Sequence, residues 1–264
     1  MISYIFDVDG VLTNILAKQA NPELLSQVAD LLKNGNVVVF NTGRSFPWLI
    51  EHILTPFQKY IYLKEFEGKF LAVCEMGNIV YEFQEGSWKE TIDPSTSVPE
   101  SLKAEIRQLV QTEYAESMFF DDKKTMVSVE VIDGYDSQEY LQQQKKLMDQ
   151  IHQILQKPEY KNCHLKTGSN QIALDVQNEI SGKNLGAEKI MDWLKKQGFQ
   201  INSVVTFGDN ASDLEMAEAF VKEFTVEFVY AGKDRDQIDS SKYPFKITFT
   251  KSLYDEGTLE YLRN

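Results

Sequence analysis

Three short apolar segments of the sequence each run directly into a polar turn: residues 2–6, 37–40 and 204–207. Each turn leads into a segment in which apolar residues recur at helical spacing, so residues 1–55 already alternate strand, helix, strand and helix. Strands that are apolar on both faces are typical of a parallel sheet covered by helices on both sides. We therefore predict a doubly wound α/β domain.

The pattern changes after about residue 68. Apolar segments with antiparallel-type spacing are combined there with two amphipathic helices, which is typical of an α+β module. The predicted strands cover residues 70–74, 79–83, 126–131 and 172–176, and the predicted helices cover residues 100–114 and 137–156.

The α/β pattern returns from residue 181, with a helix that ends at Gly198. Strands are predicted after it at residues 204–207, 225–230 and 245–249. We therefore expect a smaller module inserted into one α/β domain. The predicted division is residues 1–84 for the first part of the α/β domain, residues 85–178 for the inserted module and residues 179–264 for the second part.

The sequence is acidic, with 27 Lys and Arg residues, 40 Asp and Glu residues and a formal net charge of −13. Nucleic acid binds an excess of Lys and Arg, so we expect no nucleic-acid partner. Cys74 and Cys163 are not spaced as metal ligands or as a disulfide framework. No apolar run approaches the ~18 residues of a membrane span, and the N-terminus does not resemble a signal peptide. We expect a cytoplasmic monomer or small homo-oligomer with no membrane partner.

Chemically reactive side chains follow the predicted parallel strands. Asp7 follows the first strand, Thr42 and Arg44 follow the second, and Asp209 and Asp213 follow a third. Ligands of open α/β sheets bind at the carboxyl ends of the strands, so we expect these groups to converge. Three carboxylates at one point repel one another unless a cation neutralises them, and oxygen ligands favour Mg²⁺. The sequence therefore predicts a Mg²⁺ site.

Two groups near this site suit a phosphate. Thr42 offers a hydroxyl and nearby backbone N–H groups, and Lys183, at the predicted start of a helix, offers an ammonium. Each feature alone has an ordinary alternative: Asp7-Val-Asp-Gly10 also suits a turn or calcium loop, Thr42 a helix cap, and Lys183 the protein surface. The apolar residues after Gly10 count against an EF-hand, whose loop is polar and ends in Glu.

Four motifs occur in order along the chain. They are Phe6-Asp-Val-Asp-Gly-Val-Leu-Thr13, Thr42-Gly43-Arg44, Lys183 within Ser181-Gly-Lys-Asn184, and Gly208-Asp-Asn-Ala-Ser-Asp213. Together they resemble the four motifs of the haloacid dehalogenase (HAD) phosphohydrolase superfamily. A module inserted between the second and third motifs resembles the C2-capped subclass IIB, which includes the Cof-type and sugar-phosphate phosphatases. The resemblance implies a Rossmann-like core with a C2-type cap domain.

The resemblance also implies a role for each motif residue. Asp7 would be the nucleophile that forms an aspartyl-phosphate, and Asp9 would protonate the leaving oxygen and later deprotonate the hydrolytic water. Lys183 would neutralise charge on the nucleophile and on the phosphoryl oxygens. The implied substrate-binding residues are Thr42, Gly43 and Arg44, and the implied Mg²⁺ ligands are Asp7, the backbone carbonyl of Asp9, Asp209 and, in a supporting role, Asp213.

Two positions depart from the pattern of many C2-capped relatives. Val11 stands where these have Thr after Asp-Gly, and Ser212 stands where they have Asn before the last Asp. Neither change removes a group that the chemistry needs, although Ser212 alters how the last loop is braced.

The resemblance implies a Mg²⁺-dependent phosphomonoester hydrolase that acts on a small phosphorylated metabolite, and the large cap, which would close over the active site, favours a sugar or polyol phosphate. A phosphomutase, which returns the phosphoryl group to a sugar, is one alternative. A non-catalytic phosphate-binding or regulatory module is the other. Against the latter, a binding role does not require both the Asp7 nucleophile and the Asp9 acid.

Overall fold

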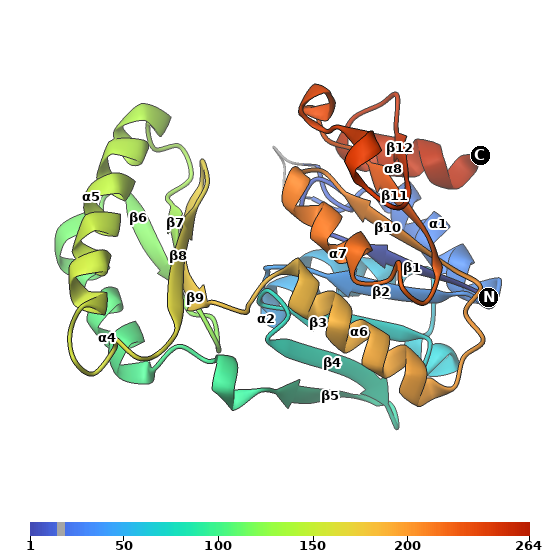
Figure 1. The fold of residues 1–264 in the computed structure, drawn as a ribbon, viewed down its shortest axis with the longest axis horizontal. Helices are drawn as coiled ribbons and strands as arrows, with labels where there is room; N and C mark the ends of the chain where they lie inside the picture. The colour runs from blue at the N-terminus through green and yellow to red at the C-terminus, as the bar shows by residue number, and fades with distance from the viewer. Residues whose placement is uncertain (15–18) are drawn as a thin grey trace. The chain divides into compact units, whose positions relative to one another are not determined.

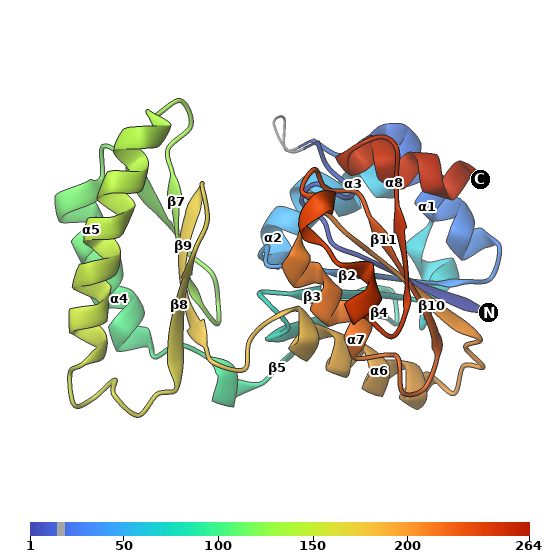
Figure 2. The same ribbon diagram turned by 45° about the horizontal axis from the view of Figure 1, so that its top comes forward.

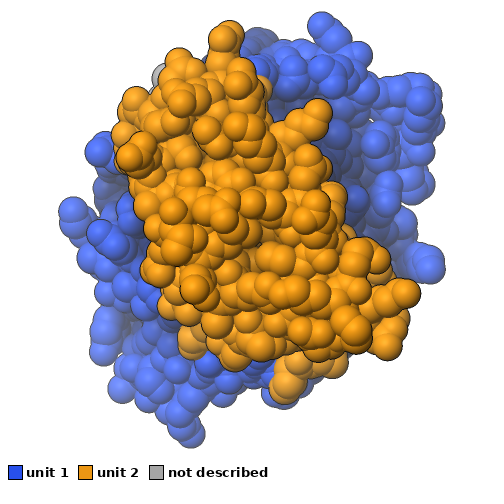
Figure 3. Space-filling view, turned by 90° about the vertical axis from the view of Figure 1, so that its left-hand side faces the viewer, with its two compact units in different colours: residues 1–92, 182–264 blue, residues 93–181 orange. Residues whose placement is uncertain are grey.

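The computed structural model describes residues 1–14 and 19–264, and the chain divides into two compact units. Unit 1 consists of residues 1–92 and 182–264, and unit 2 of residues 93–181 (Figure 3). The chain therefore leaves unit 1 once, forms unit 2 and returns to unit 1.

Unit 1 is built on an eight-stranded sheet with the strand order β12-β11-β10-β1-β2-β3-β4-β5 (Figure 1). The six strands from β12 to β3 are parallel, and β4 and β5 are antiparallel at one edge. The strands are β1 (Ile2–Phe6), β2 (Val37–Asn41), β3 (Phe70–Cys74), β4 (Ile79–Gln84), β5 (Ser87–Ile92), β10 (Ser203–Gly208), β11 (Thr225–Tyr230) and β12 (Lys246–Phe249). The predicted α/β architecture is confirmed.

Helices cover both faces of this sheet, as its apolar strands predict (Figures 1 and 2). One apolar core includes residues of α1, α2, α3 and α8, and the other includes residues of α6 and α7. The helices are α1 (Pro22–Lys33), α2 (Phe46–Leu49), α3 (Thr55–Phe57), α6 (Lys183–Gln197), α7 (Leu214–Glu218) and α8 (Tyr254–Arg263). Among the helices of residues 1–14 and 19–264, none is long and apolar enough to cross a bilayer.

Local sequence signals fix the ends of the longer helices. The Asn21 side chain accepts the N–H groups of Glu23 and Leu24 at 3.1 and 3.3 Å and so caps α1, with Pro22 at its first position. The C-terminal end of α6 is fixed by Gly198, whose φ of +70° is the left-handed conformation of a helix C-cap. The predicted start of α6 at Lys183 and its predicted end at Gly198 are confirmed.

The strand order places a topological switch between β1 and β10. From β1 the chain moves to β2 and β3 on one side, and from β10 it moves to β11 and β12 on the other. Phe6 and Phe207 pair in register across the switch, and their rings stack with centroids 4.4 Å apart. The residues that follow them leave the sheet side by side, at the position where open α/β sheets bind ligands.

The strands predicted at residues 70–74 and 79–83 lie in unit 1 as β3 and β4. Their pattern resembles that of the middle module, although the predicted division places them before residue 85. All five residues of β3 are buried and pair in parallel with β2, and β4 pairs antiparallel to β3. A strand buried on both faces needs helices above and below it, and unit 1 provides them. The observed division falls after Ile92 and Ser181, whereas the division proposed from the sequence falls after residues 84 and 178.

Unit 2 is a four-stranded antiparallel sheet, with the order β6-β7-β9-β8, packed against two helices. The elements are β6 (Met118–Asp121), β7 (Val127–Val131), β8 (Leu165–Ser169), β9 (Ala173–Asn178), α4 (Glu100–Leu109) and α5 (Ser137–Leu155). Its core is separate from those of unit 1 and contains Ile106 of α4, Leu147 of α5 and Val129 of β7. The predicted α+β module is therefore present.

Candidate active site

Asp7 lies at the carboxyl end of β1. Its N–H donates to the carbonyl of Phe207 in β10 at 3.0 Å, which continues the sheet by one residue. Its Oδ1 accepts the N–H of Val8 at 2.7 Å, and its side chain is 9% exposed. The chain then turns at Gly10, whose φ of +69° lies in the left-handed region that favours glycine. The turn leads the chain away and leaves the Asp7 carboxylate at the edge of the sheet.

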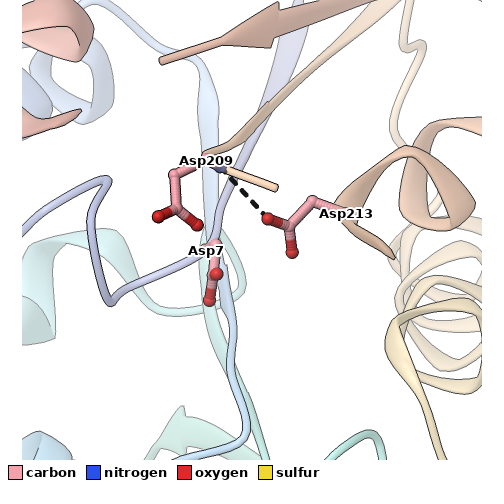
Figure 4. A group of neighbouring side chains, drawn as sticks. All are labelled: Asp7, Asp209 and Asp213. Atoms are coloured by element: carbon pink, nitrogen blue, oxygen red, sulfur yellow. Dashed lines mark hydrogen bonds between the residues drawn. The ribbon is translucent and has the colours of Figure 1, made fainter. Parts of the chain in front are cut away.

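Asp209 and Asp213 belong to the turn that follows β10. The N–H groups of Asp209 and Asn210 donate to Oδ2 of Asp213 at 3.1 and 3.2 Å; Figure 4 draws the first of these bonds. Asn210 also caps the next turn, and its Nδ2 donates to Oδ1 of Asp209 at 3.0 Å. A side chain at Gly208 would clash, because its Cβ would lie 2.3 Å from Cβ of Asp213. Asp213 is fully buried and braces the loop that carries Asp209.

The three carboxylates meet at one point (Figure 4). One oxygen from each of Asp7, Asp209 and Asp213 lies within 4.8 Å of the other two. Burial, followed by repulsion from Asp7, raises the pKa of Asp209 to about 6. Burial also raises the pKa of Asp7 to about 7, although Lys183 opposes the shift. Clustered carboxylates that disfavour one another's charge have the donor chemistry that suits a hard divalent cation such as Mg²⁺.

Lys183 brings a positive charge to this cluster from the first turn of α6. Its Nζ lies 2.5 Å from Oδ1 of Asp7 and 3.3 Å from Oδ1 of Asp213, and it donates to the carbonyl of Asn41 at 2.7 Å. Burial opposes the charged form, but the two carboxylates outweigh it and raise the pKa of Lys183. Lys183 is therefore an ammonium at neutral pH and partly neutralises the cluster.

Thr42 and Gly43 follow β2 directly. The Thr42 hydroxyl oxygen accepts the N–H of Arg44 at 3.1 Å, so its hydrogen can be donated elsewhere. The N-cap of α2 is Ser45, so Thr42 does not cap that helix. A Cβ at Gly43 would lie 2.9 Å from Cε of Met76, which shows how closely the two loops approach. Thr42 therefore keeps a hydroxyl donor available in a tightly packed loop.

Asp9 pairs with Arg44 instead of joining the three clustered carboxylates. Nε and Nη2 of Arg44 donate to the two Asp9 oxygens at 2.9 and 3.0 Å. The guanidinium also lies over the ring of Trp48, 4.6 Å from its centroid, and Trp48 stacks on His52 at 4.3 Å. The Arg44 side chain is 10% exposed and the Asp9 side chain 42%. Arg44 thus holds the carboxylate of Asp9 with both of its oxygens engaged.

Two residues in these contacts were missed by sequence reasoning. Asn41 accepts a hydrogen bond from Lys183, and Trp48 supports the guanidinium of Arg44. A signal was present for each of them. Asn41 is the one polar residue of β2, and Trp48 is an aromatic residue only four positions after Arg44.

Residues 4–227 match the protein-family model described as haloacid dehalogenase-like hydrolase. The matched range contains all four motifs, from Asp7 to Asp213. No curated protein sequence matches the chain significantly.

Solved structures of similar fold cover almost the whole chain. A haloacid dehalogenase-like hydrolase from Bacteroides thetaiotaomicron is 12% identical with a TM-score of 0.64, and the match covers 99% of this chain and 98% of that one. The C-terminal domain of a trehalose-6-phosphate phosphatase from C. albicans is 13% identical with a TM-score of 0.64, covering 99% and 91%. A protein from Thermotoga maritima is 16% identical with a TM-score of 0.60, covering 99% and 96%.

At these sequence identities the solved structures show only a shared fold. Membership of the family is shown by the match of the sequence to the family model. That match spans well over half of the chain and includes both strands that carry the clustered carboxylates. The chain therefore belongs to the haloacid dehalogenase-like hydrolases, as its four motifs predict.

Proposed function

We propose that the protein is a Mg²⁺-dependent phosphomonoesterase that acts on a small phosphorylated metabolite through an aspartyl-phosphate. The observation that best supports this proposal is the buried Asp7 carboxylate, which contacts the Lys183 ammonium at 2.5 Å and clusters with Asp209 and Asp213. A nucleophile, a countercharge and donor oxygens for a cation are thereby combined at one point.

Asp7 supplies the attacking oxygen in this proposal. A carboxylate oxygen of Asp7 bonds to phosphorus, and the bond from phosphorus to the leaving oxygen breaks with its electron pair on that oxygen. Lys183 lies beside Asp7 and stabilises the charge on the phosphoryl oxygens as they pass through the transition state. The hydroxyl of Thr42 donates a hydrogen bond to one of these oxygens.

Asp9 moves the proton in both steps. It first protonates the leaving oxygen, and it then takes a proton from the water that attacks phosphorus, so that phosphate leaves and the Asp7 carboxylate is restored. Both Asp9 oxygens accept hydrogen bonds from Arg44, so a hydrogen bond between Asp9 and the leaving oxygen competes with this pairing. In this proposal Asp9 exchanges one of these hydrogen bonds for the leaving oxygen, and the Arg44 donor released in this way binds a substrate oxygen.

The carboxylates of Asp7, Asp209 and Asp213, with the backbone carbonyl of Asp9, would hold Mg²⁺. The ion would supply positive charge for the phosphoryl oxygens when bound. The raised pKa of Asp7, about 7, means that without a bound cation part of the nucleophile is protonated at neutral pH. Both considerations support a requirement for the metal.

We infer that unit 2 is the C2-type cap domain and that the substrate is a sugar or polyol phosphate of the cytoplasm. Three observations support this. Unit 2 is inserted between the motif of Thr42 and that of Lys183, and the fold is shared over nearly its whole length with a trehalose-6-phosphate phosphatase domain. The acidic net charge of −13 also fits a small substrate better than a polyanion.

Phosphate release from a panel of phosphorylated metabolites tests the proposal. We expect Mg²⁺-dependent turnover that a chelator abolishes and that Asp7→Asn lowers by at least about a thousandfold. Asp149→Asn, an exposed aspartate on α5, is the matched control and keeps full activity. Silence of the wild type across the whole panel would contradict the proposal, and isomerised sugar phosphate without net release would point to a mutase.

A further inference from the structure

Asn41 and Lys183 contact each other at two points. The side-chain Nδ2 of Asn41 donates to the backbone carbonyl of Lys183 at 3.1 Å. In the opposite sense, Nζ of Lys183 donates to the backbone carbonyl of Asn41 at 2.7 Å. Both residues are buried, and Asn41 is completely inaccessible to solvent. One residue at the end of β2 therefore holds both the main chain and the side-chain tip of Lys183.

The first turn of α6 fits this contact without spare room. A Cβ at Gly186 would lie 2.2 Å from Oδ1 of Asn41, so only glycine lets the helix come this close. On the other side, a Cβ at Gly77 would lie 2.5 Å from the nitrogen of Gly186. The N–H of Gly182 donates to the carbonyl of Met76 at 2.8 Å. The turn that carries Lys183 is thus confined between the end of β2 and the loop after β3.

The asparagine side chain contributes little to the stability of the fold. Its Oδ1 is buried and has no hydrogen-bond partner, which carries a desolvation cost that nothing offsets. The four residues before it in β2 are apolar and fully buried, so an apolar side chain of the same shape would suit the strand. The amide nitrogen is the part of the side chain in use, and its partner is the main chain of Lys183.

The ammonium of Lys183 has three hydrogens and three neighbouring acceptors. These are Oδ1 of Asp7 at 2.5 Å, the carbonyl of Asn41 at 2.7 Å and Oδ1 of Asp213 at 3.3 Å. The two carboxylates attract the charge, but they do not fix how far the lysine extends from α6. Asn41 sets that distance, because it binds both ends of the lysine.

We propose that Asn41 is a positioning residue that holds the Lys183 ammonium against Asp7, an inference that rests on the proposed phosphatase function. The Lys183 ammonium is then already positioned beside the phosphoryl group when it bonds to Asp7, and the lysine does not need to reorganise in the transition state. Loss of the amide leaves the charge present but less well placed. The effect should therefore fall on kcat more than on KM.

Hydrogen exchange tests the contact without reference to activity. Asn41→Leu keeps the shape of the side chain and removes its donor, and Asn41→Ala serves if leucine does not fold. We expect exchange of the Ala187 amide, which follows Lys183 by one helical turn, to accelerate about tenfold while the melting temperature is unchanged or higher. Thr206→Val is the matched control, because Thr206 in β10 is also buried with an unpartnered oxygen but does not contact Lys183.

A double-mutant cycle tests the catalytic consequence. We expect Asn41→Leu to lower kcat at least about tenfold with little change in KM, and to cause no further loss in a Lys183→Ala background. Thr206→Val keeps wild-type kinetics. Additive losses, or wild-type kcat in Asn41→Leu, would overturn the positioning role.

The two experiments separate this inference from the proposed function. If the wild type releases no phosphate, the phosphatase proposal fails, and the exchange result alone decides whether Asn41 holds Lys183. Unchanged exchange of the first turn of α6 in both Asn41 variants would overturn the contact whatever the activity.

Discussion

Asp7 combines burial with a need for charge. Its side chain is 9% exposed and lies beside two other carboxylates, so its pKa rises, yet the nucleophilic role that we propose for Asp7 requires a deprotonated carboxylate. Lys183 is the residue of the chain that opposes this shift most directly. The site is therefore a place where the fold gives up stability for reactivity, as active sites commonly do.

This conflict predicts a pH-dependent stability in metal-free protein. The pKa values of Asp7 and Asp209, about 7 and about 6, lie above the 3.8 of an ordinary aspartate, so between these values the folded state binds more protons than the unfolded state. The contribution of these groups to the free energy of unfolding is present below about pH 4 and is lost as pH rises through 6 and 7. Thermal unfolding in the presence of a chelator measures this loss of stability as pH rises.

Comparison with Asp7→Asn isolates this effect from other titrating groups. The melting temperature of the variant relative to the wild type should rise by roughly 5 °C between about pH 4.5 and about pH 8. Mg²⁺ should raise the melting temperature of the wild type at about pH 8 and affect the variant much less. A difference between the two proteins that does not change with pH would contradict the assignment.

Arg44 is the second residue whose geometry makes a specific prediction. It binds both oxygens of Asp9 and lies over Trp48, and a lysine can reproduce neither the paired hydrogen bonds nor the planar stacking. Arg44→Lys should lower kcat/KM by about tenfold or more in the phosphate-release assay. Arg107→Lys is a matched control, because Arg107 in unit 2 also pairs with an aspartate and lies over an aromatic ring, and it should retain activity. Equal losses in both variants would show that the effect is not specific to Arg44.

The elements that could be predicted are those with a strong apolar pattern. β1 and β11 have the bounds that the sequence predicts, because their apolar runs end at clear turn residues. β5, β6 and β8 were not predicted. All three are edge strands, and β5 and β8 consist mostly of exposed, polar residues. An edge strand owes its conformation to the neighbour that it pairs with, and single-sequence patterns do not contain that neighbour.

The same distinction applies to the candidate site. Asp7, Asp209 and Lys183 could be selected from motif order, since each follows or begins a predicted element. The pairing of Asp9 with Arg44 could not be predicted, because it depends on how two loops meet at the sheet edge. Which residue a charged side chain pairs with depends on the tertiary structure.

The close approach of α6 to β2 predicts an unusual response to alanine. Alanine is favoured over glycine in an ordinary helix by about 1 kcal/mol. At Gly186 the added Cβ would lie 2.2 Å from Oδ1 of Asn41, so Gly186→Ala should destabilise the protein by roughly 2 kcal/mol. Thermal or denaturant unfolding measures this change.

An exposed position of the same helix provides the control. Glu188 lies on the solvent side of α6, and Glu188→Ala should change the free energy of unfolding by no more than about 0.5 kcal/mol. A stabilised Gly186→Ala protein would show that the helix does not pack against β2 as closely as described.

Two units with separate apolar cores share one chain. The core of unit 2 contains residues from both of its helices and all four of its strands, if the half-buried residues at its border are included. Its two ends are also close together, because Nδ2 of Asn178 donates to the carbonyl of Ser95 at 3.4 Å. An insertion with adjacent ends can be accommodated at a single site of the host domain.

These features predict that unit 2 folds alone. Residues 93–181, expressed as a fragment, should give a dispersed amide NMR spectrum and a cooperative thermal transition. Leu147→Asp places a charge in the core of the fragment and should abolish the transition, whereas Leu141→Asp, on the same helix but 44% exposed, should leave it. A wild-type fragment with a collapsed spectrum would mean that the core of unit 2 needs unit 1 for its stability, and the insertion would then be a dependent part of the α/β domain.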